Sequence, residues 1–344
     1  MLWGVVKLSS SKNSTVMNNE RISTSRKLAD FLVNGSVVIG FVGIVIFFAF
    51  RSGSFFRWDN ISDILLRLSI TTPAAYGVML ALVAKGIDLT PGTTMGLVGI
   101  TIASGVTAGM NFGLTIFLAI LVGVAIGLVN AFLIAKANLN PFIATISILF
   151  IGNSIEKSVT RGGLPIYLYP SPASLNQIYR GSTLGIPNPI LILVIMTLVL
   201  YLFLEKSMYG RRLYACGESI KASRASGIPV RLYYGAAYLI GAICATIGGI
   251  ILCSQIRSGQ PLVGHSYMWD AIGAAYLSTI MSRRNFRPNV FGTLFGALVM
   301  ATVANGLTLM GLAFYWKEFA KGLVILIMLL VSVMKKRYEG SRLF

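Results

Sequence analysis

Few residues of this chain have side chains that could carry out chemistry. The 344 residues include a single histidine, three cysteines and only 11 aspartates and glutamates. Cys216, Cys244 and Cys253 lack metal-ligand spacing, and His265 has no second histidine with which to build a metal centre or a catalytic dyad. The sequence has no Gly-Lys dipeptide and therefore no usual nucleotide-binding P-loop. We expect no catalytic residue, no cofactor and no metal, so binding and conformational change are the functions that remain.

Asp88 is the most informative acidic residue, because it lies between two long apolar runs, within the motif Lys85–Gly92. A charge held in a bilayer costs about 2.5 to 3.5 kcal/mol on insertion scales and usually has a function. Asp88 could cap the helix that follows it and pair with Lys85. Alternatively, Gly86 and Pro91 break the helix, and Asp88 lines an internal pathway or supports a gate.

Three asparagines in apolar surroundings are further candidates for an internal polar pathway. Asn140 precedes Pro141 and could simply cap the helix that this proline begins. Asn130 and Asn305 each end an apolar run in a similar context, Gly-Leu-Val-Asn-Ala and Thr-Val-Ala-Asn-Gly. The two runs would cross a membrane in opposite senses, as in an inverted repeat, although such clusters are common in packed membrane helices.

Residues 209–230 form a polar, basic island between apolar runs. Glu218–Ser226 reads as a short helix with Glu218 in its first turn, where a carboxylate suits the helix dipole. Small residues leave one side of this helix nearly flat. The segment suits docking into a groove on a soluble partner, and an ordinary basic loop is the alternative.

The composition is that of an integral membrane protein. Hydrophobic residues make up 55% of the chain and charged residues 12%, against about a quarter charged in soluble proteins. The mean hydropathy is +0.77, and 36 glycines suit close packing of helices. The net charge of +18 lies between the apolar runs, so we interpret it as a topology signal and expect no nucleic-acid partner.

The apolar runs predict an all-α, polytopic fold of about ten transmembrane helices. The predicted spans are 31–50, 68–84, two within 89–135 divided at 110–113, 137–157, 188–204, 232–253, 270–282, 289–310 and 315–334. Residues 1–30 and 335–344 are expected to be tails that flank a transmembrane domain, 31–334. Most Lys and Arg residues fall on one side of this topology, which places both termini and the island 209–230 in the cytoplasm.

Several motifs resemble the permeases of ribose-type ABC importers, over roughly residues 60 to 330. They are Gly86-Ile-Asp-Leu89, Pro141-Phe-Ile-Ala-Thr145, Ser258-Gly-Gln-Pro261 and, in the island, Gly210, Arg211, Tyr214, Ala215, Gly217, Ala222, Ser226, Gly227 and Ile228. One departure is the stretch Ser278–Arg287, which is bulkier and more basic than the glycine-rich turn of that family.

The resemblance implies a type II ABC importer-like permease in the bacterial cytoplasmic membrane. It implies that a separate ATPase subunit meets the island, with coupling candidates Gly210, Arg211, Gly217, Glu218, Ala222, Ser226 and Gly227. A periplasmic or lipid-anchored binding protein would deliver the solute, and a second permease copy or a paralogue would complete the channel. Glu156, Arg257 and Gln260, near the expected outer face, are candidates for docking the binding protein, and solvated loop charges are the alternative.

The expected solute is a neutral sugar or a sugar-like compound, because the apolar runs contain few charges. Nucleosides stay open, since related permeases carry them. A secondary transporter or channel that acts without an ATPase is a different class of function and stays an alternative. A membrane-embedded enzyme would need a cluster of catalytic polar residues, which the sequence does not supply.

Overall fold

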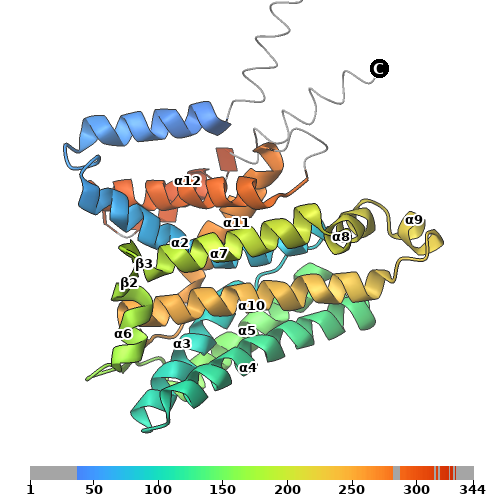
Figure 1. The fold of residues 1–344 in the computed structure, drawn as a ribbon, viewed down its shortest axis with the longest axis horizontal. Helices are drawn as coiled ribbons and strands as arrows, with labels where there is room; N and C mark the ends of the chain where they lie inside the picture. The colour runs from blue at the N-terminus through green and yellow to red at the C-terminus, as the bar shows by residue number, and fades with distance from the viewer. Residues whose placement is uncertain are drawn as a thin grey trace, which may run out of the picture.

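The computed structural model describes residues 37–281 and 287–313, together with residues 315, 316, 318–324, 326, 327 and 330. Both predicted tails lie outside the described residues. The long helices run along a common direction, with α6, β2 and β3 at one end of the bundle and α8 and α9 at the other (Figure 1). The expectation of an all-α architecture is confirmed in its coarse form, because the strands of the described chain are two residues long.

The elements follow one another with short connections. They are helix Val37–Arg51, then α2 (Trp58–Val83), α3 (Pro91–Thr107), α4 (Phe112–Ala131), the π-helix η1 (Phe132–Lys136), α5 (Pro141–Val159), β1 (Ile166–Tyr167), α6 (Ala173–Arg180), β2 (Ser182–Thr183), β3 (Ile186–Pro187), α7 (Asn188–Tyr201), the π-helix η2 (Leu202–Lys206), α8 (Met208–Glu218), α9 (Ile220–Ala225), α10 (Val230–Ile256), β4 (Ser258–Gly259), α11 (Gly264–Met281) and α12 (Val290–Leu309). β1 pairs with β4 and β2 with β3, both antiparallel.

Six described helical segments are long and apolar enough to cross a membrane. They are Trp58–Val83, Phe112–Lys136, Pro141–Val159, Asn188–Lys206, Val230–Ile256 and Val290–Leu309. The apolar window of α2 is 78% buried and that of α4 only 22%. The α2 helix therefore belongs to the centre of the bundle, whereas α4 presents large apolar side chains outward, as expected of a helix in contact with lipid.

Two predicted spans begin earlier in the structure than in the sequence analysis. The span 68–84 belongs to α2, which starts at Trp58 and includes the charged residues Asp63 and Arg67. The short span 270–282 belongs to α11, which starts at Gly264 and includes Asp270. Both predicted boundaries fall at a charged residue. A helix can nevertheless extend through a charged residue whose side chain is exposed or has a partner.

Asparagine side chains begin three of the helices. Asn111 Oδ1 accepts a hydrogen bond from the Gly113 amide at 2.8 Å, at the predicted break between the third and fourth spans. Asn140 Oδ1 accepts one from the Phe142 amide at 2.9 Å, with Pro141 at the first helical position. The predicted capping by Asn140 is confirmed.

Two pairs of core helices approach each other closely at glycine residues. At the crossing of α2 and α10, a Cβ added to Gly77 would lie 2.8 Å from the carbonyl oxygen of Gly241. Where α3 and α11 begin, a Cβ added to Gly264 would lie 2.0 Å from the carbonyl oxygen of Gly92. Only residues without side chains permit such backbone approaches, so these glycines set how closely the helices pack.

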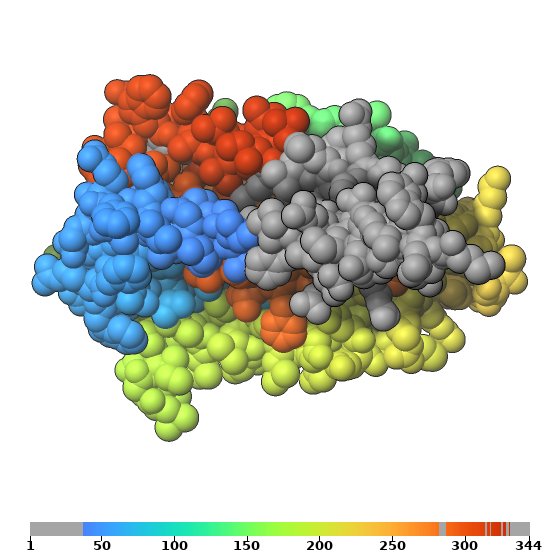
Figure 2. Space-filling model, turned by 90° about the horizontal axis from the view of Figure 1, so that it is seen from above, coloured from blue at the N-terminus to red at the C-terminus, as the bar shows by residue number. Residues whose placement is uncertain are grey.

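Helix Val37–Arg51 lies beside the C-terminal elements on one face of the molecule, as Figure 2 shows for the blue and the orange-red atoms. Its Phe41 ring meets that of Phe295 edge to face, with centroids 5.1 Å apart. Its Phe48 ring lies against Gly306, where an added Cβ would come within 2.5 Å of the ring. The first predicted span is therefore a helix packed on α12 over its described residues.

Candidate functional site

Asp88 lies in a non-helical stretch between α2 and α3, at the centre of a chain of polar contacts. It is 1% exposed, and its Oδ1 atom accepts hydrogen bonds from the amide of Thr90 at 2.8 Å and from its hydroxyl at 2.6 Å. Asn130 Nδ2 in α4 donates to the same hydroxyl oxygen at 2.9 Å. Two of the four residues predicted for the internal pathway, Asp88 and Asn130, are thus joined through Thr90.

The predicted pairing of Asp88 with Lys85 is wrong. No ion pair links these two residues, both of which lie in the described part of the chain. Asp88 instead holds the turn at Thr90, the residue that precedes α3. The other carboxylate oxygen, Oδ2, is buried without a hydrogen-bond partner in the described structure.

The stretch around Asp88 runs inside the bundle. Tyr238 of α10 places its hydroxyl against Gly86, where an added Cβ would lie 2.1 Å from the oxygen. The Thr145 hydroxyl of α5 donates to the Pro141 carbonyl oxygen of its own helix at 2.9 Å and also lies 3.4 Å from the carbonyl oxygen of Ile87. Non-helical backbone at membrane depth is tolerated where protein surrounds it, and side chains of α5 and α10 lie against this stretch.

The other two pathway candidates lie elsewhere. Asn140 is exposed at the start of α5, where its side chain caps the helix. Asn305 lies near the end of α12, and its Oδ1 atom is buried without a hydrogen-bond partner in the described structure. The predicted set is therefore not one cluster.

Glu156 is buried, and the prediction that it is a solvent-facing charge is wrong. Glu156 belongs to α5, and its side chain is fully buried. Its Oε1 atom accepts from the Thr93 hydroxyl at 2.9 Å and its Oε2 atom from the Leu262 amide at 2.6 Å. Gly96 makes room for the carboxylate, since an added Cβ would lie 2.4 Å from Oε1. Glu156 therefore ties α3 and α5 to the stretch before α11 and cannot reach a docking partner in this conformation.

Arg257 and Gln260 lie in the second interruption, between α10 and α11. Arg257 has φ 49°, in the left-handed region, and its carbonyl oxygen accepts from the Leu168 amide at 3.0 Å. Gln260 donates to the Ser258 hydroxyl at 3.1 Å. Both are partly exposed, and β4 fixes this stretch to β1. The role of Arg257 and Gln260 in docking the binding protein therefore stays a prediction.

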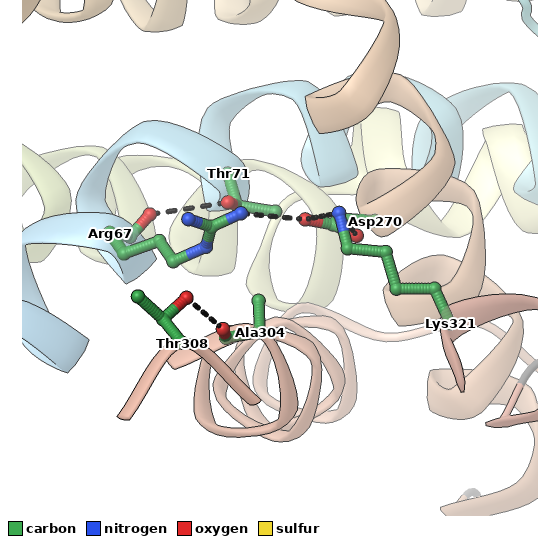
Figure 3. A network of polar contacts seen from close by, with 6 residues as sticks. All are labelled: Arg67, Thr71, Asp270, Ala304, Thr308 and Lys321. Carbon is green, nitrogen blue, oxygen red and sulfur yellow. Dashed lines mark hydrogen bonds and ion pairs between the residues drawn. The ribbon is translucent and has the colours of Figure 1, made fainter. Parts of the chain in front are cut away.

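A buried charge cluster joins α2, α11 and the helical residues that follow α12 (Figure 3). Asp270 is fully buried, and Lys321 Nζ lies 2.9 Å from its Oδ1 atom. Arg67 NH2 lies 3.5 Å from Oδ2, and the Arg67 guanidinium stacks over the Tyr267 ring at 5.7 Å. The Asp270 carboxylate is thus paired with one nearly buried cation and with one that is 31% exposed, and such partners offset part of the cost of burying its charge.

This cluster was not predicted from the sequence. The signal was present, because Lys321 lies within a predicted span and a buried basic residue needs a partner. The identity of that partner is set by the packing of three helices far apart in sequence. Hydroxyls nearby bond to their own helices, Thr71 to Arg67 O and Thr308 to Ala304 O, so they do not contribute (Figure 3).

The island 209–230 forms α8, α9 and the turn that follows. The prediction of one helix over Glu218–Ser226 is wrong at its start, since Glu218 is the last residue of α8. Ser219 is extended, with φ −152°, and its hydroxyl accepts from the Ala222 amide at 3.2 Å to begin α9. A serine between the two helices favours this break, because its side chain supplies the cap of the second helix.

Two of the coupling candidates are glycines that let α8 approach other elements. A Cβ on Gly210 would lie 1.9 Å from the carbonyl oxygen of Leu204 in η2, and one on Gly217 would lie 2.0 Å from that of Val83 in α2. The remaining candidates are exposed, namely Arg211, Glu218, Ala222, Ser226 and Gly227. Gly227 has φ 74°, a left-handed conformation that suits glycine.

α8 is tied to α10 and to the residues that precede α12. Tyr234 of α10 donates to the carbonyl oxygen of Cys216 at 3.2 Å. Tyr214 donates to the carbonyl oxygen of Pro288 at 2.6 Å. Burial raises the pKa of Tyr214, so the phenol stays protonated and keeps the proton that this hydrogen bond needs. On its other side, Glu218 pairs with Arg287 at 3.1 Å.

Comparison with known proteins identifies the family of the chain. A family model described as "branched-chain amino acid transport system / permease component" matches residues 60–332. The ribose import permease protein of Bacillus subtilis is 32% identical, over 92% of this chain and 98% of its own length. The corresponding protein of Escherichia coli K12 is 31% identical, over 89% of this chain and 95% of its own. The galactofuranose transporter permease protein of the same strain is 29% identical over 78% of each chain.

These matches run along nearly the whole length of transport permeases, and the structure supplies the apolar helices that a membrane protein needs. The chain therefore belongs to the branched-chain amino acid transport system permease component family, as a multi-pass permease of the ABC importer class.

Proposed function

We propose that this chain moves a neutral monosaccharide across the bacterial inner membrane and that a separate ATPase subunit drives it. The substrate class follows the relatives, which are named for ribose and galactofuranose. The observation that carries the proposal is the pair α8 and α9, an exposed helical projection that is bound to the core on several sides.

The contacts of α8 supply a route for mechanical coupling. A push on α9 reaches α8 through Ser219, and α8 contacts the end of α2 at Gly217. The same helix is bonded through Tyr214 to the residues that precede α12. Movement of α8 would therefore act on two core helices at once. The exposed residues Arg211, Glu218, Ala222, Ser226 and Gly227 are the surface that we assign to the ATPase.

We further propose that α2–α4 and α10–α12 are the two halves of an inverted repeat. Their contacts correspond in pairs, since α2 packs on α11 and α12 as α10 packs on α3 and α4. In this repeat α2 corresponds to α10 and α3 to α11. Each helix meets its counterpart at one of the two glycine crossings described above. An extended stretch precedes both α3 and α11. Repeats of this kind place the transport site where the halves meet.

The proposed topology puts α8 and α9 in the cytoplasm, with tails 1–30 and 335–344 on the same side and domain 31–334 in the bilayer. Basic residues of the island support this side, because cytoplasmic loops are enriched in Lys and Arg. The opposite end, with α6, β2 and β3, then faces the binding protein, with Arg257 and Gln260 as docking candidates. A second permease copy or a paralogue would complete the pathway.

The test is transport in reconstituted vesicles. The chain is co-reconstituted with its cognate ATPase and binding protein, and uptake of radiolabelled D-ribose and D-galactose is measured with and without ATP. We expect uptake only in the complete system with ATP. Uptake by the permease alone would instead identify a secondary transporter or channel, and ATP-dependent uptake of nucleosides without monosaccharides would correct the substrate class.

A further inference from the structure

A pocket of about 440 Å³ lies between the first turns of α11 and the helical residues 318–322. Its walls are His265, Ser266 and Trp269 from α11, and Glu318, Lys321 and Gly322 from the facing segment. This volume falls in the range of roughly 300 to 1,000 Å³ typical of small-molecule sites. The pocket has one aromatic wall and several polar groups that converge on it, as such sites do.

The floor of the pocket is held in place by buried contacts. His265 shares a hydrogen bond of 2.9 Å with Asn153 of α5, and Leu262, just before α11, is held by Glu156. Lys321 is anchored by Asp270 at 2.9 Å. Positions on α5 and α11 are thus fixed relative to the facing segment, so the polar groups converge in a defined geometry.

The ionised side chains of the pocket carry opposite charges, so together they favour neither an anion nor a cation. Glu318 can accept a hydrogen bond from a hydroxyl, and Lys321, which is also paired with Asp270, can donate one. Ser266 and His265 both donate and accept. The indole of Trp269, which is 52% exposed, offers a flat apolar face for the C–H side of a ring. A compact, uncharged molecule with several hydroxyl groups satisfies all of these features together.

We propose that this pocket contacts the neutral polyhydroxylated solute during its passage, with Trp269 and Glu318 as the main contacts. This inference rests on the proposed function and assigns the solute to particular side chains. The pocket follows directly after the interruption at residues 257–263, and α11, which lines it, also packs on α2 and α3 of the proposed first half, so the pocket lies beside the region where the two halves meet. A solute released at that end would meet it on the way through.

The test measures D-ribose uptake by the complete transporter with the substitutions Trp269→Ala and Glu318→Gln. We expect each to lower uptake at limiting D-ribose about tenfold, the effect of an interaction of about 1.4 kcal/mol. Trp316→Ala and Asp63→Asn are the matched controls, because Trp316 and Asp63 are exposed and do not line the pocket. Co-purification with the ATPase shows that each variant still assembles.

Ser266→Cys gives a second measurement that does not depend on the loss of a contact. The native cysteines Cys216, Cys244 and Cys253 are buried, so a methanethiosulfonate ethylammonium reagent should modify the new thiol preferentially. Modification that blocks uptake, and that D-ribose slows, supports the pocket. Uptake that survives modification, or a thiol that does not react, overturns it.

The outcomes separate this inference from the proposed function. If the unmodified transporter imports D-ribose and both pocket variants import it equally well, the pocket assignment alone fails. If the unmodified transporter imports neither D-ribose nor D-galactose, the proposed function fails and the pocket assignment fails with it.

Discussion

Tyr214 in α8 and Pro288, just before α12, are joined by a hydrogen bond of 2.6 Å from the phenol to the carbonyl oxygen. The two residues are 74 positions apart in sequence, and the bond links the proposed ATPase surface directly to the second half of the core. The bond is partly buried, which limits the access of water to it.

The first prediction follows from this bond. Tyr214→Phe removes the hydroxyl, so the residues before α12 should no longer follow α8, and sugar uptake per ATP hydrolysed should fall severalfold. Uptake and ATP hydrolysis are measured on the same vesicles. Tyr209→Phe, an exposed tyrosine in the same helix, is the control that should leave the ratio unchanged. An unchanged ratio in Tyr214→Phe would count against the coupling route.

The second prediction concerns the contact of α8 with α2. Gly217→Ala places a Cβ about where the Val83 carbonyl oxygen lies, and crowding of this kind typically costs 1–3 kcal/mol. We expect a lower thermal unfolding temperature, measured by the loss of the monodisperse peak after heating. Gly235→Ala is the matched control, because its added Cβ would come no closer than 3.4 Å to a neighbour. Equal stability of the two variants would disprove the close approach.

The third prediction concerns the buried charges. Asp270→Asn leaves Arg67 and Lys321 without their shared carboxylate, and removing one partner of a buried pair costs about 3–5 kcal/mol. The folded yield in the membrane should fall sharply. Adding Lys321→Met to Asp270→Asn should recover part of the yield, because one unpaired cation is then gone. Failure of the second substitution to help would mean that the cluster does not control folding.

The fourth prediction uses thiol chemistry to test topology. Burial raises the pKa of the Cys216 thiol, so at neutral pH it is protonated and enclosed. It should react slowly with maleimide, and the rate should rise with pH as the thiolate forms. Glu218→Cys, at an exposed position, should react readily at pH 7.

The side from which Glu218→Cys reacts decides the orientation of α8. An impermeant maleimide should label it in inverted vesicles and not in intact cells. Labelling in intact cells would place α8 and α9 outside, and the ATPase assignment would then be wrong.

Local features of the fold were predictable from the sequence. Apolar runs located the six described helical segments that are long enough to cross a membrane, and Asn140 was predicted to cap the helix that it precedes, because a cap depends on residues within a few positions. The break at Ser219 was not foreseen, although the serine itself was the signal.

Contacts between distant segments could not be predicted in the same way. From the sequence alone Glu156 was expected to be a charge in an outer loop. Its partners in the structure, Thr93 of α3 and the amide of Leu262, are distant in sequence. Asp270 reads as the start of a span until Arg67 and Lys321 converge on it. Each of these partners is more than 50 positions away, and only the packing of the helices brings them together.

The crossing of Gly77 and Gly241 has a mechanical consequence. Backbone meets backbone there, so no side chain separates α2 from α10 at this point. The contact lies deep in the bundle, and α8 contacts the C-terminal end of α2 at Val83. Two long helices that cross at such a contact can pivot about it, so a small tilt of α2 relative to α10 at one end of the pair produces an opposite displacement at the other end.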